Sequence, residues 1–340
     1  MPVQTQPQQG TRIHSVVGTV AHDSIVTITG LNLGSHAQYH GTQGKLARMW
    51  ENFETGNFTS NPYGKWGLFS PPALSILKDS PTKRGGKNDH YLFRRNNLEL
   101  GALEIPGQDH KEYFLSHYIR ISDSFSVCEG QTHQWKLSRF TSVNNKVNVY
   151  PDYNCNGNST LFVMGIEFTN PQILGHQTYI SAPFSTPQKN WHRWDIYIKK
   201  ASDSAAYDGI LQIYIDNKLV YDFKKDTGIP YLNGKGFSNS NGDFAGSIFI
   251  GSYFSGASAN TYVDYDDIYL DHTLARVEIG ENPNWNECTH SEIQPPISWS
   301  QDSIKIKVNQ GTFSQNGTAY FFVIDKSGTA SDGYAITFSN

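Results

Sequence analysis

The stretch HSVVGTVAHDSIVTITGLNLGSH, residues 14–36, predicts two β-strands that cannot form a stable domain by themselves. Polar and apolar residues alternate through VTIT, residues 26–29, which is the period of a half-buried strand. The segment AHDS joins the strands as a hairpin, and an isolated hairpin is only marginally stable in water. The composition changes after Gly34, so the rest of this sandwich has to come from another part of the chain.

The composition favours a β-sheet protein and argues against several other classes. The 340 residues allow one large or two ordinary domains. Aromatic residues make up 13% and charged residues 17%, and a net charge of −4 gives no general attraction to nucleic acid. No apolar stretch is long enough to span a membrane, and residues 1–12 lack the features of a signal peptide, so we expect synthesis in a cytoplasm.

Residues 39–272 contain one strand pattern after another, separated by turn signals such as NCNGNS and NSNGD. No segment has the pattern of an amphipathic helix of three turns. Many strands without intervening helices exclude a parallel βαβ architecture and predict an all-β sandwich or barrel.

Three segments resemble the concanavalin A-like jelly roll of lectins, glucanases and polysaccharide lyases. They are MWENFETGNF at residues 49–58, WHRWDIYIKK at 191–200 and VDYDDIYLD at 263–271. The resemblance covers about two thirds of the chain and implies a jelly-roll sandwich; it says less about activity, because one scaffold carries many functions.

Both ends of the chain resemble an IPT/TIG domain, which has an immunoglobulin-like fold. ITGLNLG, residues 28–34, is similar to the signature of the family, and SIKIKV and AYFFVID near the C-terminus resemble its later strands. We therefore expect residues 1–35 (arm and first strands) and 273–340 (remaining strands) to form one Ig-like sandwich, with the jelly roll of residues 36–272 inserted between them. The alternative is a loose N-terminal strand pair beside a separate C-terminal Ig-like domain.

Strand alternation predicts a carbohydrate-binding face on the jelly roll. If the polar sides of several strands coincide, one groove would hold seven residues: Tyr118, Arg120, Lys136, Arg193, Asp195, Tyr197 and Tyr214. Tyrosines stack on sugar rings, while arginine and lysine suit anionic sugars. The alternative is an ordinary solvated sheet face.

No catalytic residues are predicted. The paired carboxylates of the glucanases, in an E-x-D-x-x-E pattern, are absent. Gln131 and His133 match the Q-x-H strand of alginate lyases, but alternation places His133 beside Trp135 on the buried side, so we expect a core histidine. No required cofactor is expected. The resemblance to sugar-binding modules implies a structural calcium ion held by Glu54 and Asp267, although Asp267 could instead cap a strand end.

These observations predict a non-catalytic protein of a bacteriophage virion surface, either a capsid decoration (cement) protein or a fibre. It would be made in the host cytoplasm, assemble on capsid or tail proteins as a homo-oligomer or in a lattice, and bind a glycan through the lectin-like module. The first alternative is a polysaccharide lyase or hydrolase, a depolymerase acting on an anionic glycan. The second is an extracellular bacterial carbohydrate-binding adhesin.

Overall fold

The computed structural model describes most of the strands and the whole C-terminal region. The described residues are 10–36, 49–57, 67–69, 74–78, 90–95, 102–105, 111–122, 134–141, 147–156, 159–168, 178–181, 189–199, 202, 208–222, 248–251, 254–255 and 261–339. The chain divides into two compact units. The smaller unit contains Met1–Arg48 and Thr273–Asn340, and the larger unit contains Met49–His272, so its first boundary lies after residue 48 and not after 35.

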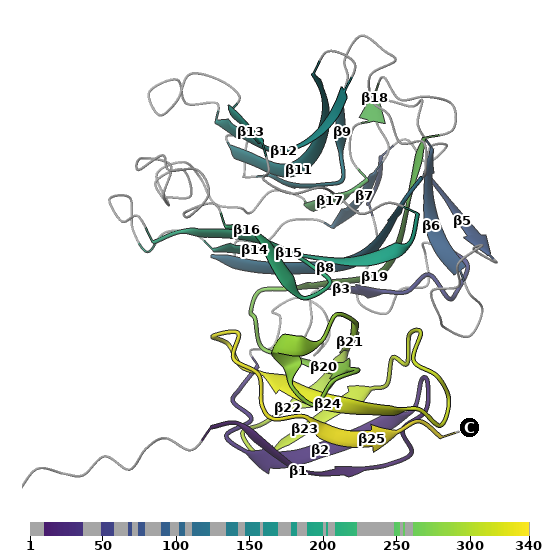
Figure 1. Ribbon diagram of the computed structural model, residues 1–340, viewed down its shortest axis with the longest axis vertical. Coiled ribbons are helices and arrows are strands. Elements are labelled where there is room, and N and C mark those ends of the chain that lie inside the picture. The colour runs from purple at the N-terminus through teal and green to yellow at the C-terminus, as the bar shows by residue number, and fades with distance from the viewer. Residues whose placement is uncertain are drawn as a thin grey trace, which may run out of the picture. The chain divides into compact units, whose positions relative to one another are not determined.

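The smaller unit has two four-stranded antiparallel sheets (Figure 1). The first has the order β1 (Arg12–Val17), β2 (Ile25–Leu31), β23 (Ser303–Lys307) and β22 (Pro296–Trp299). The second has the order β21 (Ser291–Gln294), β20 (Arg276–Gly280), β24 (Thr318–Ile324) and β25 (Tyr334–Thr337). A short 3-10 helix, η5 (Trp285–Glu287), follows β20.

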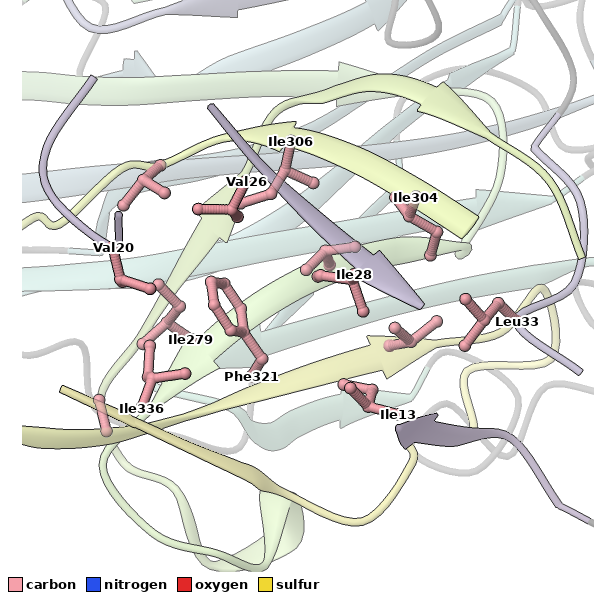
Figure 2. Packing of buried hydrophobic residues seen from close by; sticks show 14 of the residues in the cluster. Ile13, Val20, Val26, Ile28, Leu33, Ile279, Ile304, Ile306, Phe321 and Ile336 are labelled. Carbon is pink, nitrogen blue, oxygen red and sulfur yellow. The ribbon is translucent and has the colours of Figure 1, made fainter. Parts of the chain in front are cut away.

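Both ends of the chain build the core of this unit. β2 pairs with β23 from Ile25↔Lys307 to Thr29↔Ser303, more than 270 residues apart in sequence. Figure 2 shows Val26 and Ile28 of β2 packed among Ile304, Ile306 and Phe321 from the C-terminal strands. The N-terminal hairpin therefore buries its apolar face against strands from the other end of the chain. The assignment to the IPT/TIG family stays a prediction.

Gly30, inside the ITGLNLG segment, allows the close approach of β1 to β2. A Cβ atom at this position would lie 2.1 Å from the carbonyl oxygen of Arg12. No real Cβ contact is that short, so any larger residue would push β1 away from its partner. The glycine of the motif is explained by backbone packing.

The larger unit consists of an eight-stranded and a nine-stranded antiparallel sheet. The eight-stranded sheet has the order β16 (Lys218–Asp222), β15 (Ile210–Ile215), β14 (Trp191–Lys199), β8 (Glu112–Ile121), β19 (Tyr262–Asp271), β6 (His90–Arg95) and β5 (Leu74–Lys78), with β3 (Met49–Glu51) also paired to β19. The main path of the nine-stranded sheet is β13 (Thr178–Ser181), β12 (Ser159–Phe168), β11 (Val147–Asn156), β10 (Ser138–Thr141), β17 (Ile248–Ile250), β7 (Ala102–Ile105) and β4 (Gly67–Phe69). β9 (Gln134–Lys136) pairs with β11 and with β18 (Phe254–Ser255).

The two sheets of the larger unit pack face to face (Figure 1). The hydroxyl of Tyr265 in β19 donates a hydrogen bond of 3.0 Å to the carbonyl oxygen of Leu137, next to β9. The rings of Tyr113 in β8 and Phe140 in β10 lie 6.5 Å apart. These contacts define the inner faces of the sandwich. The predicted all-β jelly-roll class is confirmed, and η5 is the only helical segment among the residues described above.

Candidate functional site

The strands of the eight-stranded sheet separate polar from apolar side chains as alternation predicts. Arg193 lies opposite Tyr118, while Trp194 lies opposite His117. Trp194 and His117 are fully or almost fully buried, and His117 packs against the ring of Tyr265 on the inner face. The residues that alternate with Trp194 along β14 and with His117 along β8 therefore point to the outer face, away from the nine-stranded sheet.

Six of the seven predicted carbohydrate-binding residues share this outer face, and the seventh does not. The six come from β8, β14 and β15: Tyr118, Arg120, Arg193, Asp195, Tyr197 and Tyr214. Lys136 belongs to β9 in the nine-stranded sheet. The structure therefore does not form the single groove of seven residues, because the hydrogen-bonding order puts β9 in the opposite layer.

The outer face of the eight-stranded sheet carries a buried ion pair. Arg193 Nε donates to Asp195 Oδ1 at 2.9 Å and to Ser116 Oγ at 3.1 Å. The side chains of Arg193 and Asp195 are only 2% and 5% exposed. Two charges so far from water need each other, so removing either one would leave an uncompensated buried charge. The pair has a clear structural role.

The tyrosines of this face are buried or hydrogen-bonded within the protein. Tyr118 and Tyr197 are buried, and burial, followed by the nearby Glu112 carboxylate, raises the pKa of Tyr197 well above its usual value. The hydroxyl of Tyr214 donates to Gln212 Oε1 at 3.1 Å. These side chains do not form an open stacking surface in this structure, and their role in carbohydrate binding stays a prediction.

A second buried ion pair involves Asp264, which is not among the residues predicted from the sequence. Arg120 donates to Asp264 Oδ2 through Nε at 2.7 Å and also through Nη2. Asp264 Oδ1 is buried and has no hydrogen-bond partner among the described residues. Burial raises the pKa of Asp264 to about 7, although Arg120 acts in the opposite direction. Alternation in VDYDD could have placed Asp264 opposite Arg120, but only with the pairing of β8 and β19 known.

Aromatic rings surround the cationic member of this pair. The guanidinium carbon of Arg120 lies 5.4 Å from the ring centre of Trp191, 5.6 Å from that of Tyr91 and 5.9 Å from that of Tyr262. Cation–π contacts of this kind stabilise a cation that has lost most of its water. They stabilise the Arg120 guanidinium in its position beside Asp264.

Lys136 lies on the outer face of the other sheet, close to a tyrosine. Phe140 points to the inner face, where its ring lies near that of Tyr113. Val149 pairs with Phe140 and shares that face, so Tyr150, the next residue of β11, points outward. Lys136 pairs with Asp152, two residues further along, and thus shares the face of Tyr150. Its Nζ atom lies 4.0 Å from the centre of the Tyr150 ring. The two side chains form a cation–aromatic pair in β9 and β11, and both are buried.

The two predicted calcium ligands lie on segments that meet at one sheet edge. β3 pairs with β19 through Glu51↔Ile268, which brings the turn containing Glu54 to the part of β19 that contains Asp267. In the part of the chain that the structure describes, no group of three His, Cys, Asp or Glu side chains could hold a metal ion. Calcium binding stays a prediction. Gln131 and His133 lie outside the described residues.

No protein-family model matches this chain, and no curated protein matches it. Solved structures do match. One is the alginate lyase Aly36B in complex with alginate trisaccharide, at 15% identity and a TM-score of 0.47, covering 66% of this chain and 98% of that one. Another is the endo-β-1,4-glucuronan lyase of the fungus Trichoderma reesei, at 15% identity and a TM-score of 0.42, covering 67% and 97%. A third is the botulinum neurotoxin type G receptor-binding domain, at 9% identity and a TM-score of 0.40, covering 86% and 79%.

These similar structures correct one expectation. The sequence predicted a protein without catalytic activity, whereas the solved structures that resemble it include lyases of alginate and of glucuronan. The prediction "not an enzyme" is therefore contradicted. No helix among the described residues is long and apolar enough to cross a membrane.

Proposed function

We propose that the larger unit binds a uronate-containing polysaccharide on the outer face of the nine-stranded sheet and cleaves it by β-elimination. The observation that carries this proposal is the Lys136–Tyr150 pair, in which an ammonium group is held 4.0 Å from the centre of a tyrosine ring. It combines the two group types that this reaction needs: a cation for the carboxylate and a hydroxyl that can transfer a proton.

The chemistry assigns one role to each residue. The ammonium group of Lys136 binds the uronate carboxylate and stabilises the negative charge that develops when the adjacent C5 proton is removed. Lys136 is 6% exposed and Tyr150 is fully buried, so a sugar unit has to enter between the groups that cover this pair, where charge stabilisation is stronger because water is excluded. Tyr150, as phenolate, takes the C5 proton; the electron pair forms the C4–C5 double bond, the bond from C4 to the glycosidic oxygen breaks, and that oxygen receives the proton from Tyr150.

The test uses the full chain with alginate and glucuronan as substrates and laminarin as a neutral control. β-Elimination produces an unsaturated uronate, which is followed by ultraviolet absorbance alongside a reducing-end assay. We expect absorbing product from at least one uronate polymer and none from laminarin. Lys136→Ala and Tyr150→Phe should each lower the rate by roughly 100-fold or more, the usual effect of losing a charge-stabilising or proton-transferring group.

Lys199→Ala is the matched control, because this lysine is half exposed and lies in the eight-stranded sheet. It should change the rate by less than about twofold, as a surface substitution outside the site does. New reducing ends without ultraviolet absorbance would indicate hydrolysis and overturn the elimination mechanism. No cleavage of either polymer, or unchanged cleavage in both site variants, would overturn the proposal.

A virion location, capsid or tail partners and an oligomeric state remain separate proposals. They concern where the protein acts and are compatible with depolymerase activity. Detection of the chain in purified virions by mass spectrometry would support the virion location, and its absence from them would refute it.

A further inference from the structure

A polar pocket lies at one end of the smaller unit. Its volume is about 500 Å³, which is within the usual range of roughly 300–1,000 Å³ for small-molecule sites. It is formed where several loops meet: the start of β1, the exit from β2, the β22–β23 turn and the turn after β24. The lining residues are Gly10, Thr11, Asn32, Leu33, Gly34, Ser35, Ala275, Gln301, Asp325 and Lys326.

The backbone of the pocket wall is held by hydrogen bonds between these loops. Leu33 N–H donates to the carbonyl oxygen of Gln301 at 2.9 Å. The hydroxyl of Thr11 donates to the carbonyl oxygen of Asn32 at 3.0 Å. The bond from Leu33 to Gln301 joins segments from both ends of the chain, so the pocket exists only when the two ends are assembled.

Asp325 is a carboxylate held in place by its own turn. Its Oδ1 atom accepts hydrogen bonds from Ser327 N–H at 2.8 Å, from the Ser327 hydroxyl at 2.6 Å and from Thr329 N–H at 3.0 Å. Burial alone would raise the pKa of Asp325, but these hydrogen bonds outweigh it and lower the pKa, so the group is ionised at neutral pH. Oδ2 makes no hydrogen bond among the residues that the structure describes, and it remains available as an acceptor.

The other polar groups complement this acceptor. Ser35, Gln301 and Lys326 are exposed, and the described part of the chain gives their side chains no hydrogen-bond partner. One carboxylate and one ammonium group give the lining no net charge. Amide, hydroxyl, carboxylate and ammonium groups together offer donors and acceptors to vicinal hydroxyl groups, and they give no preference for an anion.

We propose that this pocket binds a neutral sugar unit of an oligosaccharide, as a glycan-binding site separate from the Lys136–Tyr150 pair. The mixed, neutral and hydrophilic lining favours a polyhydroxylated ligand over an apolar or an anionic one. The proposal does not depend on lyase activity, because its residues all belong to the smaller unit.

Two variants test the site by different means. Gly10 lines the pocket, and a Cβ atom there would meet no atom within 4 Å, so Gly10→Trp adds a large side chain at the pocket wall without a clash at Cβ. Asp325→Asn keeps an oxygen for the turn and removes the charge. Lys305→Ala is the control, because Lys305 is an exposed residue of β23 outside the pocket lining.

The assay is saturation-transfer NMR on the full chain with cellotriose, maltotriose and triacetylchitotriose, and with a mannuronate trisaccharide for comparison. We expect at least one neutral trisaccharide to bind, with affinity at least tenfold lower in Gly10→Trp and in Asp325→Asn and unchanged in Lys305→Ala. Any binding of the mannuronate trisaccharide should be unaffected by these variants, which separates this site from the proposed lyase site. Absence of binding by all three neutral probes, or binding that survives both pocket variants, would overturn the proposal.

Discussion

The strongest test of the shared core compares two isoleucines of the same strand. Ile28 is fully buried in the core of the smaller unit, whereas Ile25, three residues earlier in β2, is 61% exposed. Ile28→Ala should strongly destabilise this unit, and Ile25→Ala should have little effect. Both substitutions remove the same atoms from the same strand, so the comparison isolates burial.

The expected size follows from the packing of Ile28. Replacing a buried isoleucine by alanine costs about 2–5 kcal/mol, the higher values applying where the surrounding structure cannot collapse into the cavity. Ile28 packs in a cluster with residues of both sheets, including Ile304 and Phe321 (Figure 2), so we expect about 3–4 kcal/mol. The exposed Ile25 loses β-propensity alone, about 1 kcal/mol or less.

The assay is native-state hydrogen–deuterium exchange of the full chain. Peptides covering β23 and β24 report on the smaller unit, and a peptide covering β8 provides an internal reference in the larger unit. A loss of about 3 kcal/mol speeds exchange through global opening by roughly 100-fold, since each 1.4 kcal/mol is a factor of ten. Exchange in β8 should stay at the wild-type rate.

Two results would refute the reasoning. If Ile28→Ala increased exchange only in β1 and β2, while β23 and β24 kept their protection, the N-terminal hairpin would not be part of the cooperative core. If Ile25→Ala had as large an effect as Ile28→Ala, burial would not be the cause.

Two further predictions concern a buried carboxylate and a glycine. Folding raises the pKa of Asp264 from 3.8 to about 7, so the folded protein favours the protonated carboxyl. The resulting stabilisation is fully present below about pH 4 and is lost as the pH rises through 7. It amounts to up to about 4 kcal/mol of unfolding free energy. Thermal unfolding of wild type and Asp264→Asn at pH 5 and pH 8 should therefore give a stability difference that changes with pH, and a constant difference would contradict this. Gly311→Ala should cost about 2–5 kcal/mol, since φ is +52° and a Cβ would lie 2.0 Å from the buried Glu292 carboxylate. In Gly328→Ala the nearest atom would be 3.4 Å away, so only backbone strain of about 1–2 kcal/mol is expected, and equal losses of melting temperature in the two variants would refute the clash.

Local patterns in the sequence were enough for the fold class and for the sides of individual strands. Alternation in WHRWDIYIK separates Trp194 and Ile196 from Arg193 and Asp195, and the pairing of β14 with β8 shows the same separation. This works because side chains of a regular strand point to opposite faces at every step. The burial of the polar side was not predictable in the same way, since it depends on what covers the strand.

The break between β9 and β10 places Lys136 and Ser138 on opposite faces of the sheet. Regular alternation places Lys136 and Ser138 on the same side. In the structure Lys136 pairs with Asp152, whereas Ser138 pairs with Ile250 and is fully buried. The chain breaks between β9 and β10 at Leu137, whose N–H donates to the carbonyl oxygen of Pro151 and whose own carbonyl oxygen accepts from Gly251. A shift of one residue at such a break moves the side chains that follow it to the opposite face of the sheet.

The same limit explains why the predicted binding face divided into two surfaces. Alternation assigns a side chain to one face of its own strand, but the membership of a strand in a sheet is fixed by hydrogen bonds to distant strands. Lys136 and Arg193 both have the pattern of outward-facing cations, yet β9 pairs with β11 and β14 pairs with β8. The outward cation of β14 is neutralised by the adjacent Asp195, whereas that of β9 lies against the ring of Tyr150. Arg193 and Asp195 are buried together, so an anionic sugar could pair with Arg193 only by replacing Asp195. Lys136, held 4.0 Å from the ring centre of Tyr150 in the other sheet, is the cation that we propose to bind a uronate.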